Sequence, residues 1–211
     1  MKRVIAFQGS PRIGGNTAAL LQEALNGAES QGAETEMIHI CKLRMTGCRG
    51  CYSCKKQGDG YGKCILKDDM TEIYAKIDRA DGIMMGSPVY MCAMTPELKM
   101  VLDRLFPYIN MSLESLMKKG KKCGLVFTQN QPDSKLFEWH FNMTAFMLNT
   151  IGLEQPEILV STNTIGYKDK DLPDLVGTDL RQVHENKLTY KATAMQEDRR
   201  RAYKMGVRLA G

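Results

Sequence analysis

The stretch KRVIAFQGSPRIGGNTAALLQEAL, Lys2–Leu25, carries the signals of one fold in direct succession. Its first part, residues 2–8, is an apolar run that stops at Gly9, which is typical of a buried strand. A polar loop rich in glycine follows. Apolar residues at helical spacing then continue until Gly32. A strand, a loop and an amphipathic helix in this order predict the start of an α/β domain.

Strand and helix alternate along the rest of the chain. Further strands are predicted at residues 36–40, 81–87, 121–128 and 157–161, with helices from Asp68–Asp69, from Thr95–Pro96 and over 135–151. This alternation predicts an α/β fold in which a doubly wound sheet of five parallel strands has helices on both faces. Residues 162–190 are expected to be irregular, and residues 192–211 helical and basic. Ligands should bind outside the carboxyl ends of the strands, where the loops after strands one, two and three are expected to meet.

Composition limits the class of protein. The chain has 211 residues, of which 43% are apolar and 25% charged, so it can bury a core without disulfides. It has no apolar run of the roughly eighteen residues that a membrane span needs. We expect a cytoplasmic protein without membrane association.

The positive charge is concentrated in one segment. The formal net charge is +5, yet residues 42–67 hold seven basic residues against one acid, or +6, which leaves −1 for the remainder. Only Tyr52 and Tyr61 in this segment could stack on bases, and no recognition-helix pattern accompanies them. The segment therefore favours a bound anionic centre over nucleic acid.

The same segment, the Cys-rich loop 41–67, contains a run of closely spaced cysteines. Cys48, Cys51 and Cys54 follow one another at two-residue intervals, and Cys64 follows after nine residues. Three cysteines at this spacing can bind three irons on one face of a [4Fe–4S] cluster, and a cysteine farther along the chain can bind the fourth iron. Zinc more often takes two separated pairs, and reduced thiols without metal are a further alternative. The other three cysteines are expected in the core: Cys41, Cys92 and Cys123.

The loop GSPRIGGNT, residues 9–17, has the features of a phosphate site. Its glycines permit close backbone approach, and amides at a helix N-terminus favour an anion. Ser10, Asn16 and Thr17 add neutral donors, and Arg12 adds a charged one. The loop lacks the lysine of a P-loop, so it predicts a site for a terminal monophosphate.

Together with GSPVYMCAMTPELKMVLDR at residues 86–104 and the Cys-rich stretch between them, this loop resembles the iron–sulfur flavoprotein branch of the flavodoxin-like NAD(P)H-dependent FMN reductase family. The resemblance covers residues 1–160. It implies a flavodoxin-like strand order 2-1-3-4-5, a Cys-rich insertion after the second strand, and a C-terminal helical extension at 161–211 that is not a separate domain.

The resemblance also implies FMN as a cofactor. It places the FMN phosphate at Ser10, Arg12, Gly15, Asn16 and Thr17, the ring beside Pro88, Val89, Tyr90 and Met91, and the closing loop at Thr128, Gln129 and Asn130. No catalytic side chain is expected, because the flavin itself carries the hydride and electron steps. The implied partners are NAD(P)H or a ferredoxin-type electron partner and further copies of the chain, as a homodimer or homotetramer.

Three hypotheses for function follow. The first is an FMN-dependent oxidoreductase that passes electrons between a two-electron donor and one-electron carriers through a [4Fe–4S] cluster. The second is a cluster-free NAD(P)H-dependent FMN or quinone reductase. The third is an electron-carrier or metal-binding module without turnover. Asp103 and Arg104 are expected to form a surface ion pair, and the histidines to be structural: His39, His140 and His184.

Overall fold

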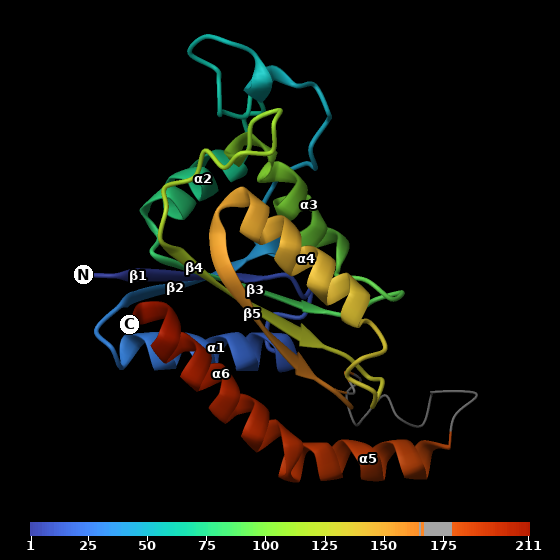
Figure 1. Ribbon diagram of the computed structural model, residues 1–211. Coiled ribbons are helices and arrows are strands. Elements are labelled where there is room, and N and C mark those ends of the chain that lie inside the picture. Colours follow the sequence, from blue (N-terminus) through green and yellow to red (C-terminus); the bar gives the residue numbers. More distant parts are fainter. Residues whose placement is uncertain (165, 167–178) are drawn as a thin grey trace.

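The computed structural model describes residues 1–164, 166 and 179–211 and contains a single five-stranded sheet in these ranges (Figure 1). The strands are β1 (Arg3–Gln8), β2 (Glu34–His39), β3 (Gly82–Pro88), β4 (Lys121–Thr128) and β5 (Leu153–Ser161). All neighbours pair in parallel, in the order β2-β1-β3-β4-β5. The predicted flavodoxin-like fold is therefore confirmed.

Helices cover both faces of the sheet, as Figure 1 shows. They are α1 (Asn16–Glu29), α2 (Met70–Arg79), α3 (Pro96–Arg104), α4 (Glu138–Ile151), α5 (Leu180–Ala192) and α6 (Ala194–Ala210). One core layer lies under α2, α3 and α4, and the other under α1 and α6. Among the described residues, no helix combines the length and apolarity that crossing a lipid bilayer requires.

Side chains of β1 alternate between these two layers. Ile5 and Phe7 belong to the layer with α2, α3 and α4, whereas Val4 and Ala6 belong to the layer with α1 and α6. All four are fully buried. A strand buried on both faces has to be apolar throughout, which explains the continuous apolar run from which the fold was predicted.

Two glycines let α1 and α6 touch backbone to backbone. A Cβ added at Gly206 of α6 would overlap the carbonyl of Ala24, and one added at Gly27 of α1 would overlap the carbonyl of Tyr203. Met205 and Leu209 of α6 are buried beside this crossing. The helix thus completes the core layer on this face of the sheet.

Several boundaries differ from the predicted ones. Helix α1 ends at Glu29, and Gly32 adopts a φ of +78° three residues later in the turn that follows. Helix α3 ends at Arg104 instead of continuing to Ile109, because Pro107 has no N–H for an α-helical bond and the chain forms a 3-10 turn at Phe106–Tyr108. The strand predicted at 157–161 begins at Leu153.

The prediction that residues 162–190 are irregular was wrong for residues 180–190, whereas the described residues 162–164, 166 and 179 are irregular as expected. Residues 180–192 form α5, and the side chain of Asp179 caps it by accepting a hydrogen bond from Gln182 N at 3.1 Å. Asp is a strong N-cap residue. Residues 165 and 167–178 lie outside the described residues.

Candidate functional site

Three loops meet at the carboxyl edge of the sheet, after β1, β3 and β4. The hydroxyl of Thr95 donates to the carbonyl of Gly9 at 2.6 Å and so joins the loops after β3 and β1. The hydroxyls of Thr17 and Thr128 lie 2.8 Å apart and join α1 to the end of β4. Val89 N also donates to Thr128 O at 2.8 Å. The loops predicted to hold the phosphate, border the ring and close the site therefore lie together at one edge of the sheet.

The loop between β1 and α1 leaves the start of the helix free for a ligand. Gly15, at the N-cap position, offers no side-chain cap, and the first turn of α1 contains no acid. The first amides of the helix are available to an anion for this reason. Gly9 allows the close approach of neighbouring elements, since a Cβ there would lie 2.8 Å from Leu98 Cβ and 2.9 Å from Gly86 O.

The predicted phosphate donors do not all face this loop. Ser10 is buried, and its hydroxyl accepts a hydrogen bond from Arg12 N at 3.1 Å. Thr17 is also buried and is paired with Thr128. The guanidinium of Arg12 donates to the carbonyl of Gly166, so it has to turn away from that contact to reach a ligand in the loop. Asn16 is the first residue of α1.

Two buried amide oxygens at this edge have no partner among the described residues. They are Gln8 Oε1, at the end of β1, and Gln129 Oε1, just after β4. The nitrogen of each amide is bonded, to Arg12 O at 2.8 Å and to Asp133 O at 2.6 Å respectively. A buried acceptor without a donor is costly, so these oxygens suit a ligand that brings hydroxyl groups. The neighbouring Asn130 is exposed.

The loop after β3 contains a strained two-residue turn. Tyr90 N donates to Ala93 O at 2.8 Å and Ala93 N donates to Tyr90 O at 3.0 Å. Between them Met91 and Cys92 both have positive φ, 46° and 67°. Positive φ at both central residues is the geometry of a type I′ turn, and it costs about 1–2 kcal/mol at each residue that is not glycine. We call Tyr90–Ala93 the ring-side turn; Met91 at its tip is 97% exposed.

One residue at this edge was not found from the sequence. His140, on α4, accepts a hydrogen bond from Met94 N at 2.9 Å through Nε2. Its ring packs edge-on against Phe127 with centroids 5.9 Å apart, and burial lowers its pKa below the usual 6.5. The sequence carries no local signal for this contact, because forty-six positions separate the two residues.

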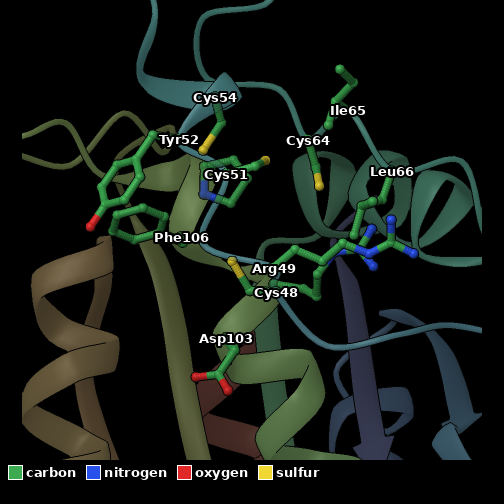
Figure 2. Close-up of a pocket in the computed structure, with 12 residues that line it drawn as sticks. Cys48, Arg49, Cys51, Tyr52, Cys54, Cys64, Ile65, Leu66, Asp103 and Phe106 are labelled. Carbon is green, nitrogen blue, oxygen red and sulfur yellow. The ribbon is translucent and has the colours of Figure 1, made fainter.

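The four predicted metal ligands line a single pocket together with Arg49, Arg104 and Phe106. Figure 2 shows the sulfurs of Cys48, Cys54 and Cys64 turned toward the same space, with Cys51 beside it. The ring of Tyr52 stands edge-on to that of Phe106, with centroids 6.0 Å apart. The grouping of the four cysteines in the chain is therefore also a grouping in space.

This pocket does not lie at the carboxyl edge of the sheet, contrary to the expectation that the first three loops meet there. Helix α3 begins beside the loop after β1, through Thr95, and ends at Arg104 in the wall of the cysteine pocket. The Cys-rich segment runs back along this helix, since Gly47 approaches the side chain of Met100. Helix α3 has nine residues, each of which adds about 1.5 Å of length. The loop after β1 and the cysteine pocket, at its two ends, are therefore about 13 Å apart.

A buried ion pair ties the ends of the Cys-rich segment together. Arg104 donates from Nη1 to Asp68 Oδ2 at 2.7 Å, from Nη2 to Asp68 Oδ1 at 3.0 Å, and from Nη1 to Thr46 O at 2.8 Å. Asp69 accepts from Arg44 N at 2.7 Å. The Arg104 guanidinium lowers the pKa of Asp68. We call these contacts of residues 44–46 with Asp68, Asp69 and Arg104 the base staple.

The expected surface pair of Asp103 and Arg104 was therefore wrong. Arg104 is 1% exposed and belongs to the base staple, whereas Asp103 pairs with Lys99 at 2.5 Å on the helix surface. Two of the three cysteines expected in the core are also exposed, Cys41 and Cys92. Cys123 is buried as expected, and burial raises the pKa of its thiol to about 12.

The thiols of the pocket have different surroundings. Burial raises the pKa of Cys54, whereas a hydrogen bond with Ser53 lowers the pKa of Cys51. Lys55 reaches over the ring of Phe106, 3.9 Å from its centroid, and donates to the carbonyls of Phe106 and Ile109. A fixed ammonium beside the thiols favours their anionic form.

The spacing of the thiols bears on what they can bind. Within the described ranges, no three Cys, His, Asp or Glu side chains lie close enough together to hold a single metal ion. Tetrahedral zinc requires four sulfurs at about 2.3 Å from one point. A [4Fe–4S] cluster takes one thiolate at each of its four irons, and four cysteines line this pocket.

Comparison with known proteins finds one matching family and several relatives. The model of the NADPH-dependent FMN reductase family matches residues 2–129. An iron–sulfur flavoprotein from Methanocaldococcus jannaschii is 45% identical over 105 residues, 50% of this chain and 52% of that protein. One from Methanosarcina thermophila is 36% identical over 102 residues, 48% of this chain and 51% of that protein. The chain thus matches about half the length of these relatives.

A third relative is matched over more of its length. An iron–sulfur flavoprotein from Clostridioides difficile is 26% identical over 184 residues, 85% of this chain and 75% of that protein. Among solved structures, an NAD(P)H:quinone oxidoreductase from Methanothermobacter marburgensis superposes with a TM-score of 0.66 at 14% identity, over 99% of this chain and 96% of that one. This likeness shows the fold. Because the family model covers residues 2–129 of the 211, the chain belongs to the NADPH-dependent FMN reductase family.

Proposed function

We propose that this protein is an FMN-dependent oxidoreductase. The observation that carries the proposal is the uncapped start of α1 behind the loop at residues 9–15, at the edge where the loops after β1, β3 and β4 meet. The family membership supports FMN as the ligand. When bound, FMN itself supplies the hydride and electron chemistry, so the side chains have to bind, orient and shield it.

Each loop has one part in this binding. The first amides of α1 and the hydroxyl of Ser10 hold the phosphate, and Arg12 adds a charged donor once it leaves Gly166. The unpaired amide oxygens of Gln8 and Gln129 accept from hydroxyl groups of the ligand. Pro88, Val89 and the ring-side turn border the flat ring.

We propose further that Cys48, Cys51, Cys54 and Cys64 hold a [4Fe–4S] cluster. The common pocket and the similarity to iron–sulfur flavoproteins support this. Lys55, Arg49 and Arg104 supply positive charge beside the thiolates, which stabilises the reduced form of a cluster. A cluster gives the protein a one-electron centre in addition to the two-electron flavin.

One observation favours a second function, a cluster-free NAD(P)H-dependent FMN or quinone reductase. The phosphate loop and the cysteine pocket lie at opposite ends of α3, about 13 Å apart, so flavin binding does not depend on the thiols. Iron content separates the two functions, and the Cys64 variant described below measures it.

We propose a cytoplasmic location, with NAD(P)H, a ferredoxin-type carrier and a second copy of the chain as partners. Tyr61 and Ile65 are exposed apolar residues of the basic segment, and Ile65 lines the cysteine pocket. The exposed Met111 lines a second pocket together with Tyr61. An apolar centre with a basic rim suits an acidic carrier. Trp139 and Phe146, exposed on the outer face of α4, suit a second copy in a homodimer or homotetramer.

Flavin-free protein is expected to bind FMN more tightly than FAD. The variant Arg12→Ala is expected to bind FMN about tenfold to a hundredfold more weakly than wild type. One charged hydrogen bond to phosphate is worth about 1.5–3 kcal/mol, and Arg12 is exposed, so the fold should persist. Titration followed by flavin fluorescence measures both. Arg200→Ala, an exposed arginine on α6, is the control. Equal affinity for FMN and FAD, or an unchanged dissociation constant for FMN in Arg12→Ala, would contradict the assignment of this loop as the phosphate site.

Cys64→Ser is expected to lower iron per chain while FMN binding stays unchanged. Three thiolates hold at best a labile cluster, whereas the phosphate loop lies at the far end of α3. The measurement is iron and flavin per chain after anaerobic reconstitution. Cys41→Ser is the matched control, since Cys41 is exposed and does not line the pocket. If the reconstituted wild type holds no iron, the cluster proposal fails and the cluster-free reductase stands.

A further inference from the structure

The ring-side turn is held by contacts on several sides. Val89 N, just before the turn, bonds to Thr128 O at 2.8 Å, and Thr95 N, just after it, bonds to Ser87 Oγ at 2.9 Å. A hydrogen bond from Met94 N to His140 Nε2, at 2.9 Å, joins the loop to α4. It acts directly beside Ala93, where the reciprocal bonds close the turn.

This last bond requires one form of the imidazole. Nε2 accepts a hydrogen bond only through a lone pair, so His140 has to be neutral with its proton on Nδ1. In the imidazolium both nitrogens carry hydrogen, and an N–H at Nε2 would face the N–H of Met94. The contact is then lost, and the strained turn loses its link to α4.

We propose that His140 is the positioning residue of the flavin site, which in its neutral form holds the ring-side turn in place through Met94. The proposal rests on the proposed function, because it takes the turn to border the flavin. His140 lies beyond the family match at residues 2–129, so this proposal is not an inference from that match.

The surroundings of the ring support this role. Phe127 of β4 lies 5.9 Å away, and Trp139 and Phe141 of α4 lie 5.6 and 6.0 Å away, centroid to centroid. Burial among these rings lowers the pKa of His140 from the usual 6.5. The imidazole is therefore held neutral near pH 7 and gains a proton when the pH falls through its lowered pKa, below 6.5.

Two substitutions at His140 distinguish its role as a hydrogen-bond acceptor from its ability to change charge with pH. His140→Gln keeps an acceptor oxygen at a similar reach but does not titrate, whereas His140→Leu keeps bulk and offers no acceptor. Dissociation constants for FMN are measured from about pH 5 to about pH 8 by flavin fluorescence, a range over which imidazole changes its charge. The FMN phosphate also titrates near pH 6, but it does so identically in all variants. His39→Gln, on β2, is the control.

We expect His140→Leu to bind FMN roughly threefold to tenfold more weakly than wild type at pH 8, as for one lost neutral hydrogen bond. His140→Gln should bind nearly as well as wild type there. The ratio of the wild-type to the His140→Gln dissociation constant should then rise as the pH falls below 6.5. A ratio that stays constant with pH, while wild type still binds FMN, would overturn the positioning role alone.

A measurement on flavin-free protein tests the positioning role of His140 independently of the proposal that the protein binds FMN. Amide exchange at Met94, compared at each pH with an amide of β4, should lose protection at low pH in wild type and retain it in His140→Gln. If wild type binds no FMN at any pH, the proposed function fails, and this exchange experiment still decides whether His140 holds the turn. Equal exchange in the two proteins would contradict the role.

Discussion

Asp68→Asn is expected to destabilise the fold by about 3 kcal/mol, because it leaves the buried guanidinium of Arg104 without a counter-charge. The Arg104 side chain has no exposed surface and that of Asp68 is 15% exposed. Asparagine has the same shape and still accepts one hydrogen bond, so the effect should lie at the lower end of the range for broken buried pairs. A loss of this size lowers the melting temperature by roughly 6–12 °C in a chain of this length.

Thermal and urea unfolding of the metal-free protein measure this loss. Asp103→Asn is the matched control: Asp103 neighbours Arg104 in the chain but pairs with Lys99 at the surface, so its loss should stay within about 0.5 kcal/mol. The pKa of Asp68 is lowered from 3.8, so its stabilisation is present above that value and is lost as the pH falls through the folded-state pKa. The two proteins should therefore converge in stability in acid. Equal stability at neutral pH would show that the pair does not hold the segment.

Gly206→Ala is expected to destabilise the fold by about 2–3 kcal/mol, although alanine normally favours a helix over glycine by about 1 kcal/mol. The added methyl group would overlap the backbone carbonyl of Ala24, so α6 has to move away from α1. Met205 and Leu209 would then lose part of their packing in the core layer. Gly27→Ala meets the backbone of Tyr203 and should act in the same direction.

Chemical unfolding measures this change in the free energy of unfolding. Gly60→Ala is the control, because a Cβ there meets nothing within 4 Å and the change should stay within about 0.5 kcal/mol. A melting temperature that rises in Gly206→Ala would mean that helix propensity outweighs the steric clash. The backbone contact of α1 and α6 would then be looser than described.

Signals that act over a few residues were sufficient for much of the fold. The apolar run at residues 121–128 is β4 with the predicted bounds, and Thr95 caps α3 with Pro96 in the first turn. Strand order followed from the family resemblance, because register and order depend on contacts between distant segments. Most predicted residues of the flavin site lie in loops that follow strands, so their place at one edge could be inferred.

The contacts of the cysteine pocket could not be predicted in this way. Arg104 pairs with Asp68 thirty-six positions away, and in the sequence its neighbour Asp103 offers a more obvious partner. The path of the Cys-rich segment along α3 depends on Gly47 and Thr46, whose partners are also remote in the chain. The same holds for His140 and Met94. In each case the decisive contact is tertiary and leaves no periodic pattern.

The base staple also bears on the order in which the protein matures. Residues 44–46 and Asp68–Asp69 are joined by the chain's own hydrogen bonds, so the Cys-rich segment is a closed loop without metal. The entropy of closing a loop changes by only about 0.6 kcal/mol when its length doubles. The arm between Cys54 and Cys64 can therefore vary in length at little cost to the sheet. For the proposed cluster, iron insertion is therefore expected to be a late, local event on a domain that has already folded.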